Sequence, residues 1–451
     1  MRPINIFLES YNTLDIKECT INKTVNEHFT ASVTGYIYGE DDEKRLYSLL
    51  NSPFVIKVIT DEQEEISLFR GQIRDMYLST EGGLRKLKIL AVSNTIELDK
   101  EKHTRTFQGV GQTYRQIMDR IKSHHENTAV IYAKGKGITT NGLVVQYMET
   151  DWEFLKRLSA QMNTVLVADC TNDHTCYYVG NPEKKGKTQL DFSKYGIRWY
   201  RDCVKGQAVE YLVNSREILK LCESIMIEGS QYYVYSIIGS MCKEEMVFEY
   251  ILRPLSGFQV QPYSHNAIAG ISIIGTVINV EDTSVQVSLS CEVDESYGNP
   301  IWFPFSSVYA SPDGTGWYCM PEIGDRIRLY IPDEKEDHAY VISAFYVDDE
   351  QNLRNNPDEK SIRTKYNKEI RLTPEKILIT NHKGMSMTLD DRNGITIKSN
   401  KNINILSEEG IEVKGEEVVM EGKQGVYFME GPNLLMVRDG IKEQAVNIEH
   451  R

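Results

Sequence analysis

The chain has 451 residues, more than one ordinary hydrophobic core accommodates, so its length predicts two to four domains. Hydrophobic residues make up 41% and charged residues 26%, which is the balance of a folded, soluble protein. Tyr outnumbers Phe by 26 to 13, and Ile and Val recur throughout, so the composition favours β structure. The net charge of −14 leaves no region with the basic footprint that nucleic-acid binding needs.

The N-terminus predicts no secretory signal, because its apolar run reaches only from Ile4 to Leu8 and is broken by Asn5. The longest apolar stretch, 267–280, contains polar residues and is too short to span a bilayer. The eight cysteines form no CxxC pair. We therefore expect reduced thiols and synthesis in the bacterial cytoplasm without a signal peptide, with any export as part of a larger particle.

Residues 1–100 are predicted to form strands of a small antiparallel barrel or sandwich. The strand-like segments are HFTASVTGYIYG, FVIKVIT, ISLFRGQIRDMYL and RKLKILAVS. Gly82 and Gly83 provide a turn between the last two.

Two helices are predicted next. Capping-box spacings mark their starts, at Thr113 with Gln116 and at Thr150 with Glu153. Their apolar faces are Tyr114, Ile117, Met118 and Ile121 in the first helix, and Phe154, Leu155, Leu158 and Met162 in the second.

On the second helix, Lys156 and Arg157 are expected on the polar side, opposite the apolar stripe. Strands resume with TVLVADC and CYYVG, which are joined by a polar turn. They continue with SIMIEGSQYYVYSIIGSM and MVFEYILR, so this second domain extends to about residue 265.

Residues 266–350 have the size of a five-stranded OB-type barrel. GTVINVED and SVQVSLSCEV predict a hairpin, and PIWFPF follows. After a turn at Gly324 and Asp325, one strand is expected to alternate Ile327, Leu329 and Ile331, and the next strand to alternate Tyr340 and Ile342. This segment has three Lys or Arg against fifteen Asp or Glu. The polar segment 351–365 is interpreted as a linker.

A repeat occupies the rest of the chain. Short apolar-x-apolar units start at Ile370, Ile377, Met385, Ile395, Ile403, Ile411, Val418 and Val426, spaced by 7, 8, 10, 8, 8, 7 and 8 residues. Turn formers separate the units. The residues expected to form the core of this structure are Ile370, Ile377, Ile379, Ile395, Ile397, Ile403, Ile405, Ile411, Val413, Val418 and Val426.

Such short strands cannot enclose a core alone, whereas three chains wound together form a three-sided prism. Eight units with two apolar residues each place about 48 side chains inside such a prism, and their burial contributes on the order of 70–140 kcal/mol before ordering entropy is subtracted. The repeat therefore predicts an obligate trimer with a triple-stranded, intertwined β-helix. Ordinary meander strands of a β domain are the alternative.

Three stretches resemble the VgrG proteins of type VI secretion, and equally the spike proteins of contractile phage tails, R-type bacteriocins and extracellular injection systems. HTRTFQGVGQTYRQIMDRI is similar to the family's segment before its first hub helix. YMETDWEFLKRLSAQMNTVLVAD is similar to its glutamate-x-aspartate-x-x-phenylalanine helix, with Glu149, Asp151 and Phe154 in the matching positions. GWYCMPEIGDRIRLYIPD is similar to its OB-domain signature.

The resemblance covers nearly the whole chain and is weakest over residues 1–90. It implies a mainly β multidomain protein made of these parts in order: a first hub β-barrel (1–100), a second hub β-barrel with inserted helices (101–265), an OB-fold barrel (266–350), the linker (351–365) and a β-helix needle with its tip (366–451).

By the same resemblance, three copies of the hub would form a ring on a hexameric tail-tube or Hcp-like ring. Further implied partners are baseplate proteins, a PAAR-like tip protein, cargo effectors and the target-cell envelope on firing. The implied function is mechanical, with no enzyme activity and no cofactor, in a particle delivered outside the producing cell or into the target cell.

Several groups of polar residues could form sites of chemistry, and each favours a structural interpretation. Asp169, Cys170, Asp173, His174 and Cys176 lie close together but lack standard zinc-ligand spacing. His124 and His125 follow a helix C-terminus, where cationic side chains are favourable. His450 lacks a second histidine for a metal site on a three-fold axis. Glu149 and Asp151 are expected at a helix start, where acids stabilise the N-terminus, rather than as a catalytic dyad.

Two other functions remain as alternatives. A β-helical polysaccharide-degrading tailspike or adhesin would need carboxylates clustered along a long β-helix face. An OB-based nucleic-acid binder would use Trp302, Phe303, Phe305 and Trp317 for stacking. The acidic charge of 266–350 opposes this interpretation, because it repels a phosphate backbone.

Overall fold

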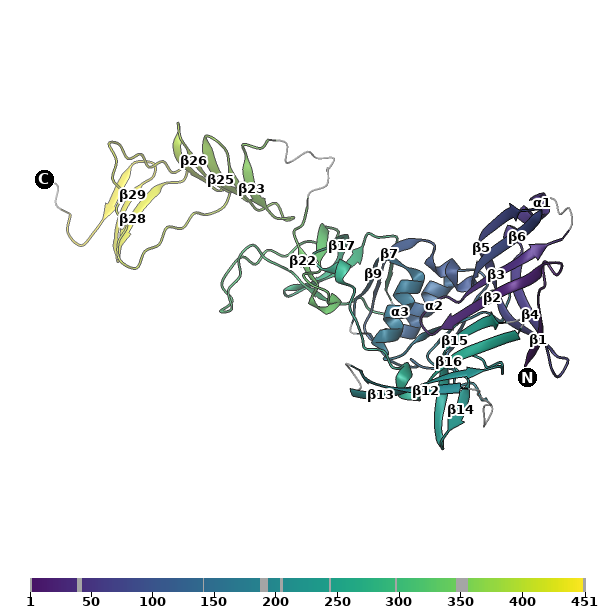
Figure 1. The fold of residues 1–451 in the computed structure, drawn as a ribbon. Coiled ribbons are helices and arrows are strands. Elements are labelled where there is room, and N and C mark those ends of the chain that lie inside the picture. The colour runs from purple at the N-terminus through teal and green to yellow at the C-terminus, as the bar shows by residue number, and fades with distance from the viewer. Residues whose placement is uncertain are drawn as a thin grey trace. The chain divides into compact units, whose positions relative to one another are not determined.

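The computed structural model describes residues 2–38, 43–140, 142–186, 194–202, 206–242, 245–296, 298–345 and 356–448. They form two compact units, Met1–Val347 and Asp348–Arg451. The described chain is mostly strand (Figure 1), with the α-helices α1 (Glu43–Ser48), α2 (Tyr114–Ser123) and α3 (Asp151–Gln161). Short 3-10 turns are η1 (Leu49–Asn51), η2 (Asn94–Asp99), η3 (Leu255–Phe258), η4 (Asn266–Ile268) and η5 (Glu336–His338). Of the described helices, none has the length and apolar character needed to cross a membrane.

An eleven-stranded antiparallel sheet dominates the first unit. Its strands are β1 (Pro3–Leu8), β2 (Asp15–Thr24), β3 (Thr30–Ile37), β4 (Pro53–Thr60), β5 (Glu65–Glu81), β6 (Leu84–Val92), β12 (Lys194–Asp202), β13 (Gly206–Ser215), β14 (Ser224–Ile227), β15 (Ser230–Cys242) and β16 (Glu245–Arg253). The order is β1-β4-β5-β6-β3-β2-β15-β16-β13-β12, with β14 on β15. Because β1 also contacts β16, the sheet nearly closes into a barrel. Strands β3, β4, β5 and β6 confirm the strands predicted within 28–39, 54–60, 66–78 and 85–93, and residue 39 lies outside the described residues.

This sheet continues across the domain boundary expected at residue 100. Strand β2 pairs with β15, with Ile21 opposite Gly239. One cluster of buried side chains extends from Leu8 to Phe258. Hydrogen bonding between segments far apart in sequence joins the two halves, and local sequence patterns do not reveal such pairing.

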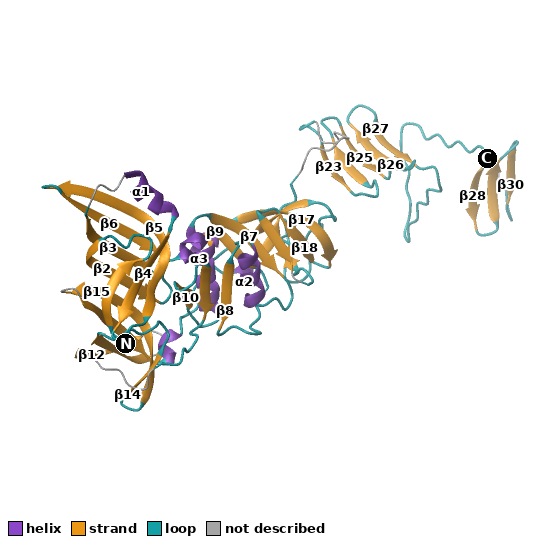
Figure 2. Cartoon of the chain, turned by 90° about the vertical axis from the view of Figure 1, so that its right-hand side faces the viewer, coloured by secondary structure: helices purple, strands orange, loops and turns teal. Residues whose placement is uncertain are grey.

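The helices α2 and α3 lie beside two small sheets, as Figure 2 shows. The sheets are β10-β11-β8 and β19-β7-β9, made from β7 (Lys102–Gln108), β8 (Thr128–Tyr132), β9 (Val144–Thr150), β10 (Leu166–Asp169), β11 (Thr175–Val179) and β19 (Val293–Ser296). Both predicted capping boxes are confirmed, with the Thr113 and Thr150 hydroxyls accepting from the backbone N–H groups of Gln116 and Glu153. The hairpin expected at TVLVADC and CYYVG is also confirmed as β10 and β11.

The predicted OB-type segment has its own five-stranded antiparallel sheet and its own core. The strands are β17 (Ser272–Glu281), β18 (Ser284–Leu289), β20 (Phe303–Pro304), β21 (Arg326–Tyr330) and β22 (Tyr340–Ile342), in the order β20-β18-β17-β21-β22. Ile327, Leu329 and Ile331 are fully buried, as their alternation predicts. On β22 the expected frame is wrong, because Val341 is buried and its neighbours Tyr340 and Ile342 are only half-buried. A three-residue strand gives no alternation from which to choose the inward face.

The second unit contains two antiparallel meanders (Figure 2). The first is β23 (Lys360–Arg363), β24 (Glu369–Leu372), β25 (Lys376–Thr380), β26 (Ser386–Asp390) and β27 (Gly394–Lys398). The second is β28 (Val426–Glu430), β29 (Asn433–Val437) and β30 (Ile441–Gln444).

Three expectations for this unit are corrected. The units at Ile370, Ile377, Met385 and Ile395 were expected to intertwine with other copies, but short turns let consecutive strands pair within one chain, which is the meander alternative. The linker predicted through residue 365 includes strand β23, because Ile362 pairs with Ile370. The units that begin at Ile403, Ile411 and Val418 lie in 399–425, where the structure has no strand. A three-residue strand needs a hydrogen-bonded neighbour, and the single chain gives these units none.

Candidate functional site: a buried polar junction and an uncovered apolar face

A buried ion pair links helix α3 to strand β9. The Arg157 guanidinium donates to both carboxylate oxygens of Glu149, from Nε at 3.0 Å and from Nη2 at 2.7 Å. Nη2 also donates to the carbonyl of Val145 at 2.6 Å, and Nη1 donates to Glu336 at 3.2 Å. Because Glu336 belongs to the OB-type segment, this one side chain joins that segment to α3 and β9.

The exposed position expected for Arg157 is wrong, since only 3% of this residue is exposed. Burial alone would lower the pKa of Arg157, but hydrogen bonds and charge from Glu149 and Glu336 raise the pKa above its usual value. Glu149 also differs from the expectation, because it is in strand β9, before the helix begins. Its acidic group therefore serves the ion pair rather than the helix N-terminus.

Asp151 is the first residue of α3 and is almost fully buried. It accepts hydrogen bonds from Arg105 at 2.7 Å, Gln146 at 2.8 Å and His125 at 2.6 Å. Burial would raise the pKa of Asp151, but the hydrogen bonds from His125 and Gln146, together with the charge of Arg105, hold it below the usual range. Each motif carboxylate thus has its own arginine, as in a structural ion pair.

Phe154 completes the motif. It is fully buried and stacks on Phe107 of β7, with ring centroids 5.8 Å apart and planes 18° apart. Together with the Asp151–Arg105 contact, this stacking packs α3 against β7 through two of the three motif residues.

Strand β19 leaves the OB-type segment and pairs in parallel with β7. Asp294 on β19 accepts from Thr106 at 2.8 Å and from Gln108 at 3.2 Å. Glu292, directly before the strand, contacts His103 at 2.9 Å, and Glu295 within it contacts Arg120 at 2.8 Å. We call the contacts of Arg105, Glu149, Asp151, Arg157 and Glu336, together with the β7–β19 pairing, the junction. Apart from Glu149 and Asp151, the sequence did not point to these residues, because their partners are distant in the chain.

The residues weighed as a zinc site have other contacts. Asp169 accepts from the Thr171 hydroxyl at 2.6 Å and from Tyr178 at 3.1 Å, and Asp173 pairs with Arg70. Burial raises the pKa of the Cys176 thiol to about 11. Among the described residues there is no group of three or more His, Cys, Asp or Glu placed to hold a metal ion. His450 lies outside the described residues.

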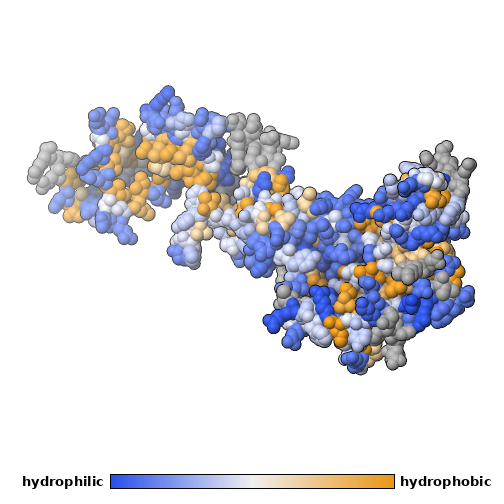
Figure 3. Space-filling model, viewed as in Figure 1, coloured by the Kyte–Doolittle hydropathy of each residue, from blue (hydrophilic) through white to orange (hydrophobic). Residues whose placement is uncertain are grey.

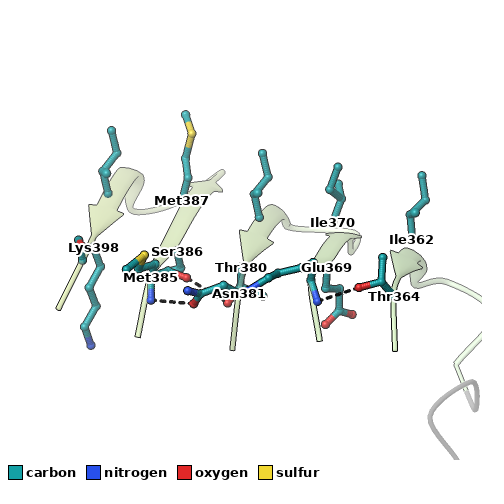
Figure 4. Close-up of a pocket in the computed structure, with 14 residues that line it drawn as sticks. Ile362, Thr364, Glu369, Ile370, Thr380, Asn381, Met385, Ser386, Met387 and Lys398 are labelled. Atoms are coloured by element: carbon teal, nitrogen blue, oxygen red, sulfur yellow. Dashed lines mark hydrogen bonds between the residues drawn. The ribbon is translucent and has the colours of Figure 1, made fainter. Parts of the chain in front are cut away.

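The sheet β23–β27 has one apolar face, made of two in-register columns. One column is Ile362, Ile370, Ile379, Met387 and Ile397, and the other is Leu372, Ile377, Leu389 and Ile395. Figure 4 shows Ile362, Ile370 and Met387 pointing to one side of the sheet, whereas Glu369 and Lys398 point to the other. The unit expected to begin at Met385 contributes Met387 and Leu389 instead, because strand β26 begins at Ser386.

This apolar face is uncovered in the single chain, and hydrophobic residues gather on the surface of this unit in Figure 3. The exposed fraction is 42% for Ile370 and 67% for Ile395. The other residues expected in the needle core are likewise exposed or half-buried: Ile377, Ile379, Ile397, Ile403, Ile405, Ile411, Val413, Val418 and Val426. The opposite face is mainly polar, with Arg371, Leu378, Thr388 and Thr396 in register.

Comparison with known proteins agrees with this architecture. Residues 273–346 match the family model of the type VI secretion system/phage-baseplate injector OB domain. The chain is also similar to the Escherichia coli c3393 protein, described as a component of the type VI secretion system with structural similarity to the T4 bacteriophage tail proteins gp27 and gp5. The TM-score is 0.54 at 11% identity, covering 75% of this chain and 99% of that one.

Two structures of a PdpA–VgrG complex are similar as well, the first of them from Francisella. The half-lidded form gives a TM-score of 0.59 at 10% identity and covers 88% of each chain. The lidless form gives 0.57 at 10% identity, covering 88% of this chain and 99% of that one. No curated protein matches the chain in sequence.

Residues 273–346 thus match an OB domain of the type VI secretion system/phage-baseplate injector family. Over most of its length the chain has a fold similar to that of the type VI secretion component c3393 and of a chain in the Francisella PdpA–VgrG complex.

Proposed function

We propose that this protein is the structural spike of a contractile injection machine, a homotrimer that caps the tail tube and punctures the target envelope when the sheath contracts. The uncovered apolar face of β23–β27 carries the proposal. A sheet with one apolar and one polar face needs a partner surface, and three copies facing a common axis supply it.

The size of this face supports a trimer. Its two columns contain nine apolar side chains per copy, hence 27 in three copies. Because most of them are already about half-covered, their burial would contribute on the order of 20–40 kcal/mol, at roughly half the usual 1.5–3 kcal/mol per side chain. Association costs roughly 4–15 kcal/mol for each of the two binding steps, or about 8–30 kcal/mol in all, so the gain is of the size that a stable trimer needs.

The segment 399–425 fits the same arrangement. Its units continue the spacing of eight residues but lack strand partners in one chain. Strands from the two other copies would pair with them and complete the triple-stranded β-helix. Ile403, Ile405, Ile411, Val413 and Val418 would then point to the axis, in line with Ile370, Ile377, Ile379, Ile395 and Ile397.

The proposed spike acts mechanically rather than as an enzyme. The proteins of like fold are spike and tail components, and the Francisella VgrG was solved with PdpA. By analogy, the hub would bind an Hcp-like tube ring and baseplate proteins, and the needle end would bind a PAAR-like tip protein or cargo. The junction serves this role, because it ties the OB domain to the hub through buried ion pairs and a shared sheet.

Complementation tests the function. A strain lacking the gene is expected to assemble no contracting particles and to lose killing of target cells, and the native chain restores both. Ile379→Glu, which would place three carboxylates at the axis, is expected not to restore them. Thr388→Glu, on the polar face of the neighbouring strand, is the matched control and is expected to restore them. Restoration by Ile379→Glu would contradict the proposal.

A further inference from the structure

The C-terminal meander β28–β30 is apolar on both of its faces. On one face Val426, Val437 and Ile441 form a row, and Phe428 and Leu435 form the next. We call these five residues the first face. Tyr427 pairs with Met436, and Met429 pairs with Leu434, on the other side of the sheet. We call these four residues the second face.

Both faces are open in the single chain. Phe428 of the first face is 47% exposed, and its neighbour Met429 of the second face is 74% exposed. The sheet β23–β27 differs, because only one of its faces is apolar. A plain prism wall has one inward and one outward face, so it accounts for β23–β27 but leaves one apolar face of β28–β30 in water.

Apolar character also changes across the strand order. Strand β28 and strand β29 each have four apolar residues among five, whereas β30 has only Ile441, followed by Lys442, Glu443 and Gln444. The order is β28-β29-β30, so the apolar strand β28 is one edge of the sheet and the polar strand β30 is the other. This pattern fits a sheet whose apolar edge lies at a symmetry axis, where both faces are covered, and whose polar edge lies in solvent. We call a sheet placed in this way a blade.

We propose that β28–β30 is a blade of a three-bladed tip, in which the first face of one copy packs on the second face of the next. This inference rests on the proposed trimer and specifies how its end is built. The edge strand β28 lies nearest the axis, and β30 lies at the solvent side.

Symmetry indicates that other copies of this chain cover both faces. A three-fold ring is built from one heterologous contact, which joins two different patches of the same subunit. The two faces of β28–β30 are two such patches, back to back on one short sheet. The nine side chains named are apolar, and the charged residues in register with them, Glu443 on the first face and Lys442 on the second, are both on the outer strand β30. On β28 and β29 the two faces therefore match each other rather than a charged partner. They also follow directly in the chain after the repeat proposed to lie on the same axis.

Cysteine accessibility in the full-length chain tests this packing. Phe428→Cys reports on the first face and Met429→Cys on the second, and both keep a small apolar side chain. Arg438→Cys, in the turn after β29, is the exposed control, since 60% of the Arg438 side chain is accessible. Each variant is treated with a maleimide, and labelling is followed by peptide mass spectrometry, which separates the new cysteine from native ones such as the exposed Cys319.

The expected result is that the thiols introduced by F428C and M429C both label about 100-fold more slowly than the thiol introduced by R438C, because each is accessible only when the tip opens. Protection at one site alone would overturn the blade, while a trimeric mass in light scattering would leave the proposed function standing. Protection of the second site only after a tip protein is added would also overturn it. A monomeric mass with both sites reactive would overturn both proposals. If F428C or M429C no longer has the mass of the native protein, Leu435→Cys and Met436→Cys, on the two faces of β29, replace them. Slow labelling is then expected at both of these sites.

Discussion

Replacing Arg157 by Met tests the junction most sharply. Met keeps the apolar volume of the arginine stem but removes the charge, so Glu149 is left as a buried carboxylate without its partner. Arg157 makes two hydrogen bonds to Glu149, at 3.0 and 2.7 Å, and both residues are buried. Breaking a buried pair from one side costs about 3–5 kcal/mol, which corresponds to a decrease in the unfolding midpoint of roughly 4–7 °C for a unit of this size.

The double variant Arg157→Met with Glu149→Leu shows how much of the lost stability comes from the unpaired buried carboxylate and how much from lost packing. Because replacing both members of a buried pair by apolar residues is often nearly neutral, the double variant should recover at least half of the stability lost. Lys156→Met is the matched control on the same helix. Its partner, Glu27, is largely exposed at 3.5 Å, so the change should be within about 1 kcal/mol.

Differential scanning calorimetry and chemical unfolding of the full-length chain supply the measurement. Three outcomes would refute the reasoning about the junction: a decrease no larger than that of the Lys156 control, equal decreases in the single and double variants, or a change confined to the unfolding of the C-terminal unit.

Three further predictions concern pH and the alternative functions. Because the folded pKa of Asp151 lies below its unfolded value, its contacts stabilise the first unit fully above about pH 4 and less as the pH falls through the folded value. Asp151→Asn should therefore show a shallower loss of melting temperature between pH 5 and pH 3 than the native chain, and equal slopes would exclude this role. Titration with labelled single-stranded DNA at low salt should show no binding, since 266–350 carries three basic against fifteen acidic residues, whereas salt-sensitive binding would support the nucleic-acid alternative. The purified protein should release no oligosaccharide from bacterial polysaccharides, and measurable depolymerisation would support the tailspike alternative.

The sequence predicted the elements whose signals are local. The capping boxes at Thr113 and Thr150 use contacts three residues apart, and the turn at Gly82 and Gly83 separates two strongly alternating strands. The hairpin β17–β18 joins neighbouring segments. In each case the residues that determine the structure are adjacent in the chain, so their pattern is sufficient.

Contacts between distant segments could not be predicted in the same way. Helical periodicity places Arg157 opposite the apolar stripe, yet it is buried because Glu336 and Glu149 approach it from other elements. The β2–β15 pairing likewise depends on tertiary folding. The other error concerned which residues of a short strand face the apolar side. Met385 and Met387 fit an alternating pattern equally well, and only the start of β26 at Ser386 shows that Met387 belongs to the strand.

The mass of the full-length protein in solution tests the central claim most directly. In the proposed trimer the apolar face of β23–β27 is covered by the other two copies, so light scattering on a gel-filtration column should give about 155 kDa, three times the chain mass of 51.7 kDa. The same species should persist at the lowest concentration that can be measured, because its apolar core is shared among the copies. A stable, well-folded species of about 52 kDa would contradict the account.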